Sequence, residues 1–545
     1  MHFNPGRRLN IEDPKAQDIS TAFPMVSYRP GQKEAIERIA QAFESGKKFV
    51  LLSAPTGSGK SVIGYTLAKM LGRAYYLTST KVLQSQLVGD FKDVVDLKGR
   101  NAYRCNYFSS LIGDLRQNGA SMKEIMDATI SANQEKNCAS GHCKSSGGAK
   151  CRFADKCEYW CRLNEAIAAD VCTMNYKSFL FQMMVGGRFD GRDLLVLDES
   201  HEAESELMSF ISLMMSDKLL LTSGVRFEDL GSVQAYQQHF QEIHLDDVLT
   251  GLKALALGRD LRDYEEFERL EMKLRMFMQE DPAYWVYELR TNRDRSKTLE
   301  FKPLFVRAQA NGLLFEKADK VLLMSATLLD HAMIRDMLGI PPKDCESITM
   351  TNRFPKENRP IYKRYAGSMN FRDKATTLPQ MVKAVDDLCR HYQEHRGIIH
   401  THNFEITNKL ADECAPDVRE RFLLQTEYRN KEEMLAEHAQ RPNSIIVAPA
   451  MHAGLDLHGD LSRFQIICKV PYPNYKENKQ LQMRMELNHG YLAYLSALKM
   501  VQSYGRSVRS EDDWADTYIL DAEFERFYKQ NRKMLPKWFL EAIKE

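Results

Sequence analysis

Short runs of consecutive apolar residues alternate along the chain with longer stretches that have the residue spacing of helices. Runs of four apolar residues occupy 49–52, 194–197 and 321–324, and each leads into small or polar residues. Continuous apolar runs of this length are typical of buried strands in a parallel sheet, which helices cover on both faces. Stretches such as 34–43 and 62–71 can supply those helices. The pattern predicts an α/β fold.

A second set of apolar runs occupies 397–402, 444–449 and 464–471, with helical stretches such as 381–394 between them. Pro341-Pro342 separates the two sets and marks a plausible boundary. We therefore expect two α/β domains, the first built from 1–97, 166–204 and 317–345 and the second from 346–545.

A long segment, 205–316, interrupts the first domain. Its apolar residues recur at spacings of three and four from Leu245 to Leu257 and from Tyr264 to Met278, with many charged residues between them. This pattern indicates amphipathic helices, and the simplest interpretation is a helical insertion. The stretches 285–290 and 298–306 look extended, and we expect them to return the chain to the first sheet.

Composition narrows the function classes only modestly. With 545 residues the chain exceeds the size of one usual core. The formal net charge of +1 does not predict a polyanionic partner, so any nucleic-acid surface must be a local patch. No apolar stretch approaches the length of a membrane span or of a signal peptide's core, which predicts a cytoplasmic protein.

The most informative stretch is Ala54-Pro-Thr-Gly-Ser-Gly-Lys-Ser61, which follows an apolar run and opens a helix-like stretch. A glycine-rich turn in this context directs backbone N–H groups and the positive end of a helix dipole at one point, which suits a phosphate. Lys60 would add a charge for the β- and γ-phosphates, and the Ser61 hydroxyl a ligand for Mg²⁺. The candidate nucleotide contacts are Ala54, Pro55, Thr56, Gly57, Ser58, Gly59, Lys60 and Ser61, with the Gln32 amide as a candidate for the adenine edge.

Further candidates follow other apolar runs. Asp198, at the tip of the run 194–197, can hold Mg²⁺ through water, and Glu199 can orient and deprotonate an attacking water. Arg506 and Arg509 stand three residues apart, and we expect them to share a helix face and to act as arginine fingers from the second domain.

Six of the eleven cysteines lie in 98–165, a segment with few large aliphatic residues. Such a segment needs a cross-link to fold stably, and a bound metal is the expected one. Thiolates at these spacings suit a tetrahedral Zn²⁺ or an Fe–S cluster equally well. The segment also carries 11 Lys and Arg against 7 Asp and Glu, interleaved with aromatic residues, a composition that suits single-stranded nucleic acid. The six cysteines are Cys105, Cys138, Cys143, Cys151, Cys157 and Cys161.

Taken in order, these segments resemble the XPD/DinG-like helicases of superfamily 2, a group that contains an iron–sulphur domain. The resemblance covers most of the chain and rests on the order and spacing of its motifs. These are Tyr28-Arg-Pro-Gly-Gln32, Ala54 to Ser61, Thr78 to Gln86, the DEAH-type box Asp198-Glu-Ser-His201, Ser325-Ala-Thr327, Gly454-Leu-Asp456 and Gln502-x-x-Gly-Arg506-x-x-Arg509.

The resemblance implies two RecA-like motor domains, with an iron–sulphur domain at 98–165 and a helical Arch domain at 205–316, both inserted in the first. It also implies a [4Fe–4S] cluster rather than zinc. Cys105, Cys151 and Cys157 are the favoured ligands, with either Cys138 or Cys143 as the fourth. Two departures from the family are the six cysteines, which make Cys161 a bystander, and Ser200, which stands where the box has Ala.

The function implied is an ATP-dependent helicase that moves 5′ to 3′ on single-stranded DNA and opens duplex forks as a monomer, without a membrane partner. ATP and Mg²⁺ would bind between the motor domains, with Ser61 and Asp198 on the metal. Gln32 and Asp456 would complete the nucleotide contacts. The implied catalytic residues are Lys60, Asp198, Glu199, His201, Gln502, Arg506 and Arg509.

Two other functions use the same motor motifs. One is a remodeller that strips proteins or RNA from DNA without processive unwinding. The other is a zinc-stabilised, RNA-dependent ATPase. The sequence does not separate them.

Overall fold

The computed structural model contains two large parallel sheets and one small antiparallel sheet. It describes residues 18–106, 110, 117–119, 121–123, 137–140, 153–186, 188–216, 229–256, 261–292, 294–449 and 457–544. None of the helices in these ranges combines the length and the apolar character that crossing a bilayer requires.

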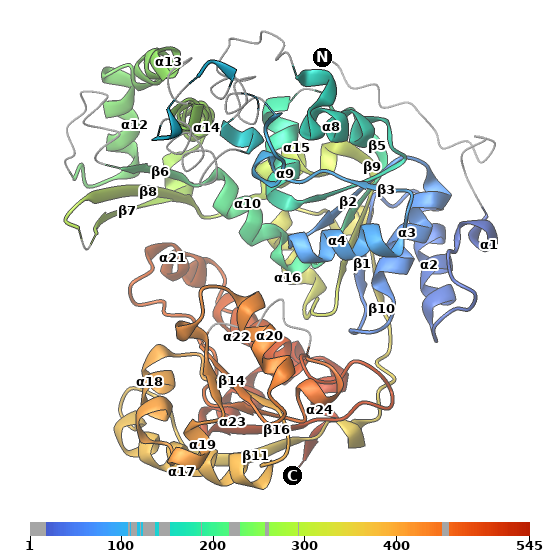
Figure 1. The fold of residues 1–545 in the computed structure, drawn as a ribbon, viewed down its shortest axis with the longest axis vertical. Helices are drawn as coiled ribbons and strands as arrows, with labels where there is room; N and C mark the ends of the chain where they lie inside the picture. Colours follow the sequence, from blue (N-terminus) through green and yellow to red (C-terminus); the bar gives the residue numbers. More distant parts are fainter. Residues whose placement is uncertain are drawn as a thin grey trace.

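The first sheet has seven parallel strands, and helices cover both of its faces (Figure 1). Alternate residues of β1 point to opposite faces, so that Val50 and Leu52 pack in one core and Phe49 and Leu51 in the other. The strands, in spatial order, are β10 (Cys345–Thr349), β1 (Phe49–Ser53), β9 (Ala318–Ser325), β5 (Arg192–Leu197), β2 (Ala74–Thr78), β4 (Val171–Asn175) and β3 (Val94–Asp96).

The two faces receive helices from different parts of the chain. One face packs against α1 (Ile19–Ala22), α2 (Gln32–Glu44), α3 (Lys60–Leu71) and α4 (Lys81–Asp90). The other packs against α8 (Glu158–Ala168), α9 (Tyr176–Phe181), α10 (Ala203–Ile211), α15 (Arg307–Leu313) and α16 (His331–Leu338).

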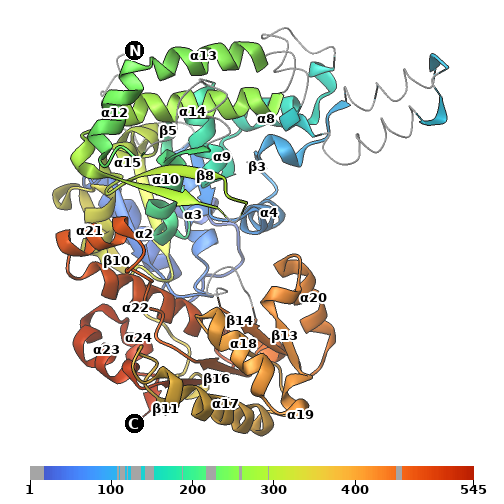
Figure 2. The ribbon, with the colours of Figure 1, turned by 90° about the vertical axis from the view of Figure 1, so that its left-hand side faces the viewer.

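The second sheet also has seven parallel strands, and it forms the lower body in Figures 1 and 2. Its strands, in spatial order, are β13 (Phe422–Leu424), β14 (Ile445–Ala448), β12 (Gly397–His400), β15 (Phe464–Ile467), β16 (Asp516–Asp521), β11 (Ile361–Gly367) and β17 (Ile543–Lys544). Its helices are α17 (Lys374–His391), α18 (Phe404–Glu413), α19 (Pro416–Arg419), α20 (Lys431–Gln440), α21 (Lys479–Leu487), α22 (Tyr491–Tyr504), α23 (Glu523–Asn531) and α24 (Lys537–Leu540).

The insertion between α10 and α15 differs from its prediction. It contains the expected helices, α12 (Val233–Glu242), α13 (Leu245–Ala256) and α14 (Leu261–Gln279). However, β7 (Trp285–Thr291) and β8 (Lys297–Pro303) do not rejoin the first sheet, because they pair with β6 (Leu213–Ser216) in a separate antiparallel sheet. The aromatic face of this sheet packs on the insertion's own helices, so the insertion has an independent core.

The predicted boundary between 345 and 346 is also wrong. It falls at the start of β10, which pairs along its length with β1 of the first sheet. The two prolines bend the chain before this strand, but the strand itself still completes the first domain. The first sheet therefore extends to Thr349.

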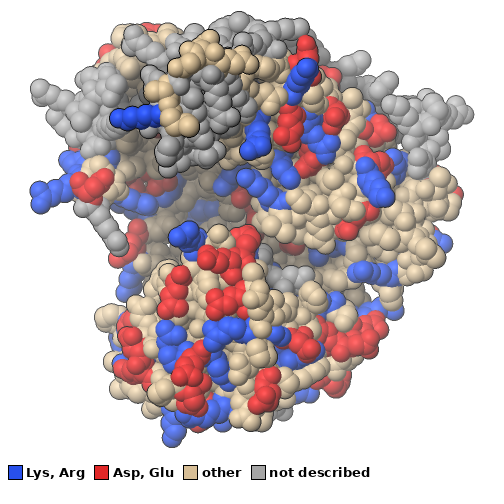
Figure 3. Space-filling model, in the orientation of Figure 1, with Lys and Arg blue, Asp and Glu red and all other residues tan. Residues whose placement is uncertain are grey.

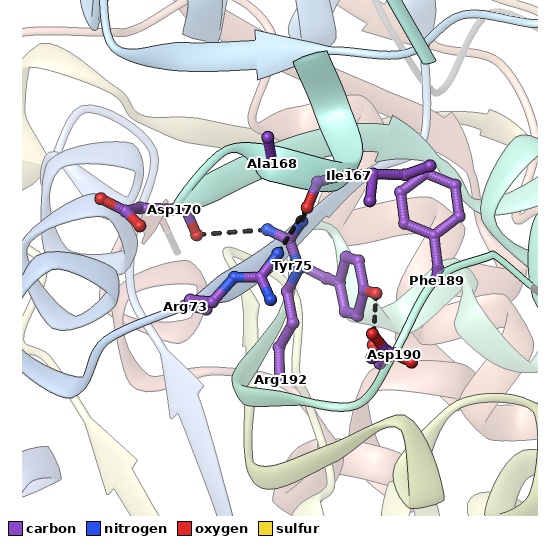
Figure 4. Close-up of a pocket in the computed structure, with 8 residues that line it drawn as sticks. All are labelled: Arg73, Tyr75, Ile167, Ala168, Asp170, Phe189, Asp190 and Arg192. Atoms are coloured by element: carbon purple, nitrogen blue, oxygen red, sulfur yellow. Dashed lines mark hydrogen bonds between the residues drawn. The ribbon is translucent and has the colours of Figure 1, made fainter. Parts of the chain in front are cut away.

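Helix α8 connects the cysteine-rich segment to the first sheet, and Cys157 is its N-cap residue. At its other end, Arg192 donates to the carbonyls of Ala166 and Ile167 at 2.8 and 3.4 Å, and Arg73 donates to Ile167 as well. These two guanidinium groups line a cavity of about 360 Å³ beside Tyr75 (Figure 4). Because cations are favourable at the carboxyl end of a helix, the arrangement anchors α8 to the first sheet.

Candidate nucleotide site and cysteine cluster

The candidate phosphate loop joins β1 to α3, as predicted. Gly57 and Gly59 have positive φ angles of 78° and 80°, which residues with a Cβ adopt only at a cost. Lys60 is the first residue of α3, and its Nζ donates to the Ala54 carbonyl at 3.3 Å. The Ala54 N–H donates to the Ser325 carbonyl at 3.0 Å, which ties the start of the loop to the end of β9.

Gln32 is buried beside this loop. Its Nε2 donates to the Gly59 carbonyl at 3.2 Å, and its Oε1 accepts from the Arg29 N–H at 2.9 Å. Arg29 in turn donates to the Gly57 carbonyl. In this structure the Gln32 amide therefore supports the loop with both its donor and its acceptor. Arg29 was not singled out from the sequence, although it lies in the motif that contains Gln32.

Asp198 and Glu199 follow β5 and lie opposite the phosphate loop. Burial, and then the charge of Glu199, raises the pKa of Asp198 to about 6. Burial would also raise the pKa of Glu199, but the charges of His201, Lys60 and Arg506 together lower it. Two adjacent carboxyl groups, Asp198 buried and Glu199 partly exposed, therefore face the loop, with Lys60 as a cation close to both. Such a site suits a divalent cation, for which Ser61 and Asp198 are the predicted ligands.

A chain of hydrogen bonds links the second domain to Glu199. The ring contacts of His201 with Gln502 and Ser325 are consistent with Nε2 as an acceptor and Nδ1 as a donor. The Gln502 amide donates to Nε2 of His201 at 2.6 Å, and Nδ1 of His201 donates to the Ser325 hydroxyl at 2.7 Å. That hydroxyl donates to Glu199 Oε2 at 3.1 Å. Residues from three of the predicted motifs, Asp198–His201, Ser325–Thr327 and Gln502–Arg509, are thus linked to the Glu199 carboxylate.

The two candidate arginine fingers reach the site from a loop, which corrects the prediction of a shared helix face. Helix α22 ends at Tyr504, and Gly505 is its C-cap residue, so Arg506 and Arg509 lie beyond the helix. Arg506 Nε donates back to the Gln502 carbonyl at 3.1 Å. Both arginines line the same cavity as the phosphate loop.

This cavity has a volume of about 850 Å³ and lies between the two domains. Most of the predicted site residues line it, namely Pro55, Thr56, Gly57, Gly59, Lys60, Ser61, Asp198, Glu199, His201, Gln502, Arg506 and Arg509. Ser58 lies in the same loop, and its Oγ is buried without a hydrogen-bond partner among the described residues. Phe354, from the segment that joins the two sheets, also lines the cavity, and no sequence pattern marked it. Asp456 lies outside the described residues.

Three of the predicted cluster ligands converge, although they lie far apart in the sequence. Cys105, Cys138 and Cys157 are all buried, and the Sγ atoms of Cys138 and Cys157 are 3.8 Å apart. A hydrogen bond with Cys105, and then burial, raises the pKa of the Cys138 thiol. Cys161 is exposed.

Cys143 and Cys151 lie outside the described residues. Within the described ranges, no group of three or more His, Cys, Asp or Glu residues has the geometry of a metal site. Cys105, Cys138 and Cys157 are of the donor type that binds Zn²⁺ and Fe–S clusters, since both take thiolate ligands.

Comparisons with known proteins agree with this architecture. Residues 386–542 match the family described as "Helicase C-terminal domain", and residues 25–224 match "Type III restriction enzyme, res subunit". No curated protein matches the chain.

Solved structures of XPD helicases share the fold over nearly the whole chain. The structure of S. tokodaii Xpd4 has a TM-score of 0.58 at 14% identity and covers 95% of this chain and 99% of its own. A structure described as "XPD_Helicase" has a TM-score of 0.61 at 14% identity, with 94% and 98% covered. A third, "XPD_APO", has a TM-score of 0.56 at 12% identity, with 92% and 98% covered.

Two parallel-sheet domains around a candidate phosphate loop, the second of which matches a helicase C-terminal domain, have the architecture of a helicase-type enzyme. The fold of the whole chain is the one seen in the solved XPD structures. The two parallel-sheet domains are RecA-like.

The closeness of the two domains at Gly57 generates a first prediction. A Cβ at Gly57 would lie 2.6 Å from the Arg509 carbonyl oxygen and 2.9 Å from Phe354. An overpacked contact costs roughly 1–3 kcal/mol, so we expect Gly57→Ala to weaken the binding of a fluorescent ATP analogue about tenfold in an equilibrium titration.

Gly46→Ala is the matched control for that variant. Gly46 also has a positive φ, 92°, but nothing lies within 4 Å of the position of its Cβ. Both variants therefore carry the same kind of backbone strain, and only Gly57→Ala obstructs the approach of the second domain. Equal affinities in the two variants would contradict the assigned contact.

Proposed function

We propose that this protein is an ATP-dependent DNA helicase that moves along single-stranded DNA, 5′ to 3′, and opens duplex forks. The observation that carries the proposal is the chain of hydrogen bonds from Gln502 through His201 and Ser325 to Glu199. It connects the second domain, through His201 and Ser325, to the carboxylate predicted to activate water. Hydrolysis can then follow domain closure, which is the coupling that a translocating motor requires.

Each candidate residue has a defined role in this proposal. The backbone of the phosphate loop and the Lys60 ammonium hold the β- and γ-phosphates. Ser61 and Asp198 hold Mg²⁺, which when bound offsets the charge of the phosphates. Glu199 orients and deprotonates the attacking water, and Arg506 and Arg509 stabilise the charge that develops on the γ-phosphoryl group.

The proposed path of the DNA follows the hollow between the two bodies. In the face shown in Figure 3, Lys and Arg side chains stand along the edges of this hollow, between the second motor domain and the parts above it. Near the base of α8, Arg100 and Arg188 stack on Trp160 at 5.4 and 4.6 Å. Cationic and aromatic groups placed together suit a strand whose phosphates meet charge and whose bases stack.

We propose that the segment 98–165 holds a [4Fe–4S] cluster through Cys105, Cys157, Cys151 and one of Cys138 or Cys143. The metal centre would provide the cross-link that this poorly cored segment lacks. A single Zn²⁺ remains the specific alternative, because thiolates bound tetrahedrally at about 2.3 Å lie about 3.8 Å apart, which is the separation of Cys138 and Cys157. We also propose 205–316 as an Arch-type domain.

The motor assignment predicts that Lys60→Ala and Glu199→Gln each lower DNA-stimulated ATP hydrolysis about a hundredfold or more, because each removes a group that acts on the reacting phosphate or water. The measurement is hydrolysis together with strand displacement on duplexes with either a 5′ or a 3′ single-stranded tail. We expect the unaltered protein to displace only the 5′-tailed strand.

Lys69→Ala is the matched control, since Lys69 lies on the same helix as Lys60 but pairs with Asp93 at the surface. It should hydrolyse ATP normally. Substantial hydrolysis in Lys60→Ala would overturn the site. DNA-stimulated hydrolysis without displacement of either strand would instead favour a remodeller.

The cluster assignment predicts that Cys157→Ser loses the metal, whereas Cys161→Ser, one helical turn away on α8, keeps it. Elemental analysis of anaerobically purified protein should give about four irons per chain for the unaltered protein and for Cys161→Ser. Strand displacement should fail in Cys157→Ser because the segment loses its cross-link. About one zinc per chain would identify the alternative site, and unchanged iron in Cys157→Ser would exclude that ligand.

A further inference from the structure

One helix of the second motor domain belongs to the cores of both motor domains. In its first half, Tyr491, Tyr494 and Leu498 are buried in the cluster that forms the core of the first domain, together with residues of α10 and α16. In its second half, Met500 and Val501 are buried in the core of the second domain. Helix α22 therefore cannot separate from either domain without exposing apolar surface to water.

A buried ion pair joins the two domains at the start of this helix. Arg484 of α21 pairs with Glu204 of α10, and their side chains are only 10% and 9% exposed. The Arg484 guanidinium also lies 4.0 Å from the centre of the Tyr491 ring, and the Tyr491 hydroxyl hydrogen-bonds to Glu204. Removing one partner would leave the other charge buried without compensation, so the pair opposes any separation at this point.

Helices α10 and α22, which meet at this ion pair and its Tyr491 contact, also approach each other at the nucleotide site. Helix α10 starts two residues after His201, and α22 carries Gln502 in its last turn. Glu204 thus fixes the beginning of α22, and His201 contacts its end. The position of the Gln502 amide on the imidazole depends on how the first half of α22 is held.

Helix α21 also contacts the insertion of the first domain. Gln480 donates to the Pro303 carbonyl at the end of β8, and Lys479 lies 5.2 Å from the centre of the Tyr287 ring on β7. In Figure 1, α21 lies directly below these strands. A cavity of about 460 Å³ at this junction is lined by residues of α10, α14, α21 and the small sheet.

We propose that α21 and the first half of α22 form the pivot about which the second motor domain turns on the first, and that Glu204 and Arg484 are positioning residues for ATP turnover. The proposal rests on the ATPase function proposed above. The contacts of α21 with β7 and β8 hold the insertion against this pivot. Neither residue lines the nucleotide cavity, so both act through Gln502 and His201.

The first test compares Arg484→Met with the double variant Glu204→Gln/Arg484→Met. Small displacements of a catalytic group cost large factors in rate, so we expect kcat for ATP to fall about tenfold or more in Arg484→Met, with KM within about twofold. The double variant leaves no uncompensated buried charge and should fold, yet it should show the same loss, because both substitutions remove one interaction.

Arg390→Met is the control, since Arg390 pairs with Asp417 at the exposed surface of the second domain. It should retain full turnover. A kcat for the double variant equal to that of the control would overturn the positioning role, because the single variant would then have failed only through its unpaired charge. A kcat for Arg484→Met equal to that of the control would overturn it as well.

The second test measures motion directly. Paramagnetic labels on non-cysteine handles would be placed at Ser85 and Glu433, exposed residues that flank the nucleotide cavity, and separately at Ser209 and Glu486, exposed residues at the pivot. On adding a non-hydrolysable ATP analogue, we expect the first distance to change and the second to stay within its original distribution.

Binding of the analogue, followed in the same samples, distinguishes the two levels of the proposal. If the analogue does not bind, the proposed ATPase function fails and the pivot with it. If it binds and the Ser209–Glu486 distance changes as much as the Ser85–Glu433 distance, only the pivot is overturned. The same holds if it binds and neither distance changes.

Discussion

The hydrogen bonds that converge on Glu199 are the constraint on which the rest of the site depends. They require the end of β5, the end of β9 and the last turn of α22 to meet within a few ångströms, although these elements lie more than a hundred residues apart in the sequence. The parallel pairing of β5 with β9, with Leu197 opposite Leu323, places Glu199 beside Ser325. Only the docked position of α22 then adds Gln502. The first domain alone can therefore form the hydrogen bonds from His201 through Ser325 to Glu199. The hydrogen bond from Gln502 to His201 requires the second domain.

The adjacent carboxylates of Asp198 and Glu199 explain why this site favours cations. Asp198, which is buried, and Glu199, which is partly exposed, are adjacent and of like charge, and burial together with the Glu199 charge raises the pKa of Asp198 to about 6. Taking a carboxylate out of water is costly unless a cation compensates it. Lys60 supplies one such charge, and a divalent ion between Ser61 and Asp198 would supply another. The negative charge of the two carboxylates thus exceeds the positive charge of Lys60 at the place where a nucleotide would bring its metal ion.

The sequence predicted the parts that local pattern determines. The apolar runs identified the central strands, and the turn Ala54–Ser61 lies where a strand–turn–helix motif requires it. The errors arise where tertiary contacts decide. The extended stretch 285–290 has the same pattern whichever sheet it joins, and only its partner β8 assigns it to the insertion. The predicted helix face of Arg506 and Arg509 failed because Gly505 ends α22 first. Likewise, the convergence of Cys105 with Cys138 depends on a path through the segment that spacing alone does not reveal.

A helix shared by two cores limits how the motor domains can move. Because the first half of α22 is buried in the first domain and its second half in the second, translation apart would expose both halves, whereas rotation about the helix's first turns exposes little. Breaking a buried ion pair by losing one partner costs about 3–5 kcal/mol. The pair of Arg484 and Glu204 therefore strongly opposes separation of the two domains at this point. A helix of 14 residues is about 21 Å long, so a small rotation at Tyr491 is amplified at Arg506 and Arg509, just beyond its far end. With the proposed pivot, motion would be largest at the two candidate arginine fingers and smallest at the junction with the insertion.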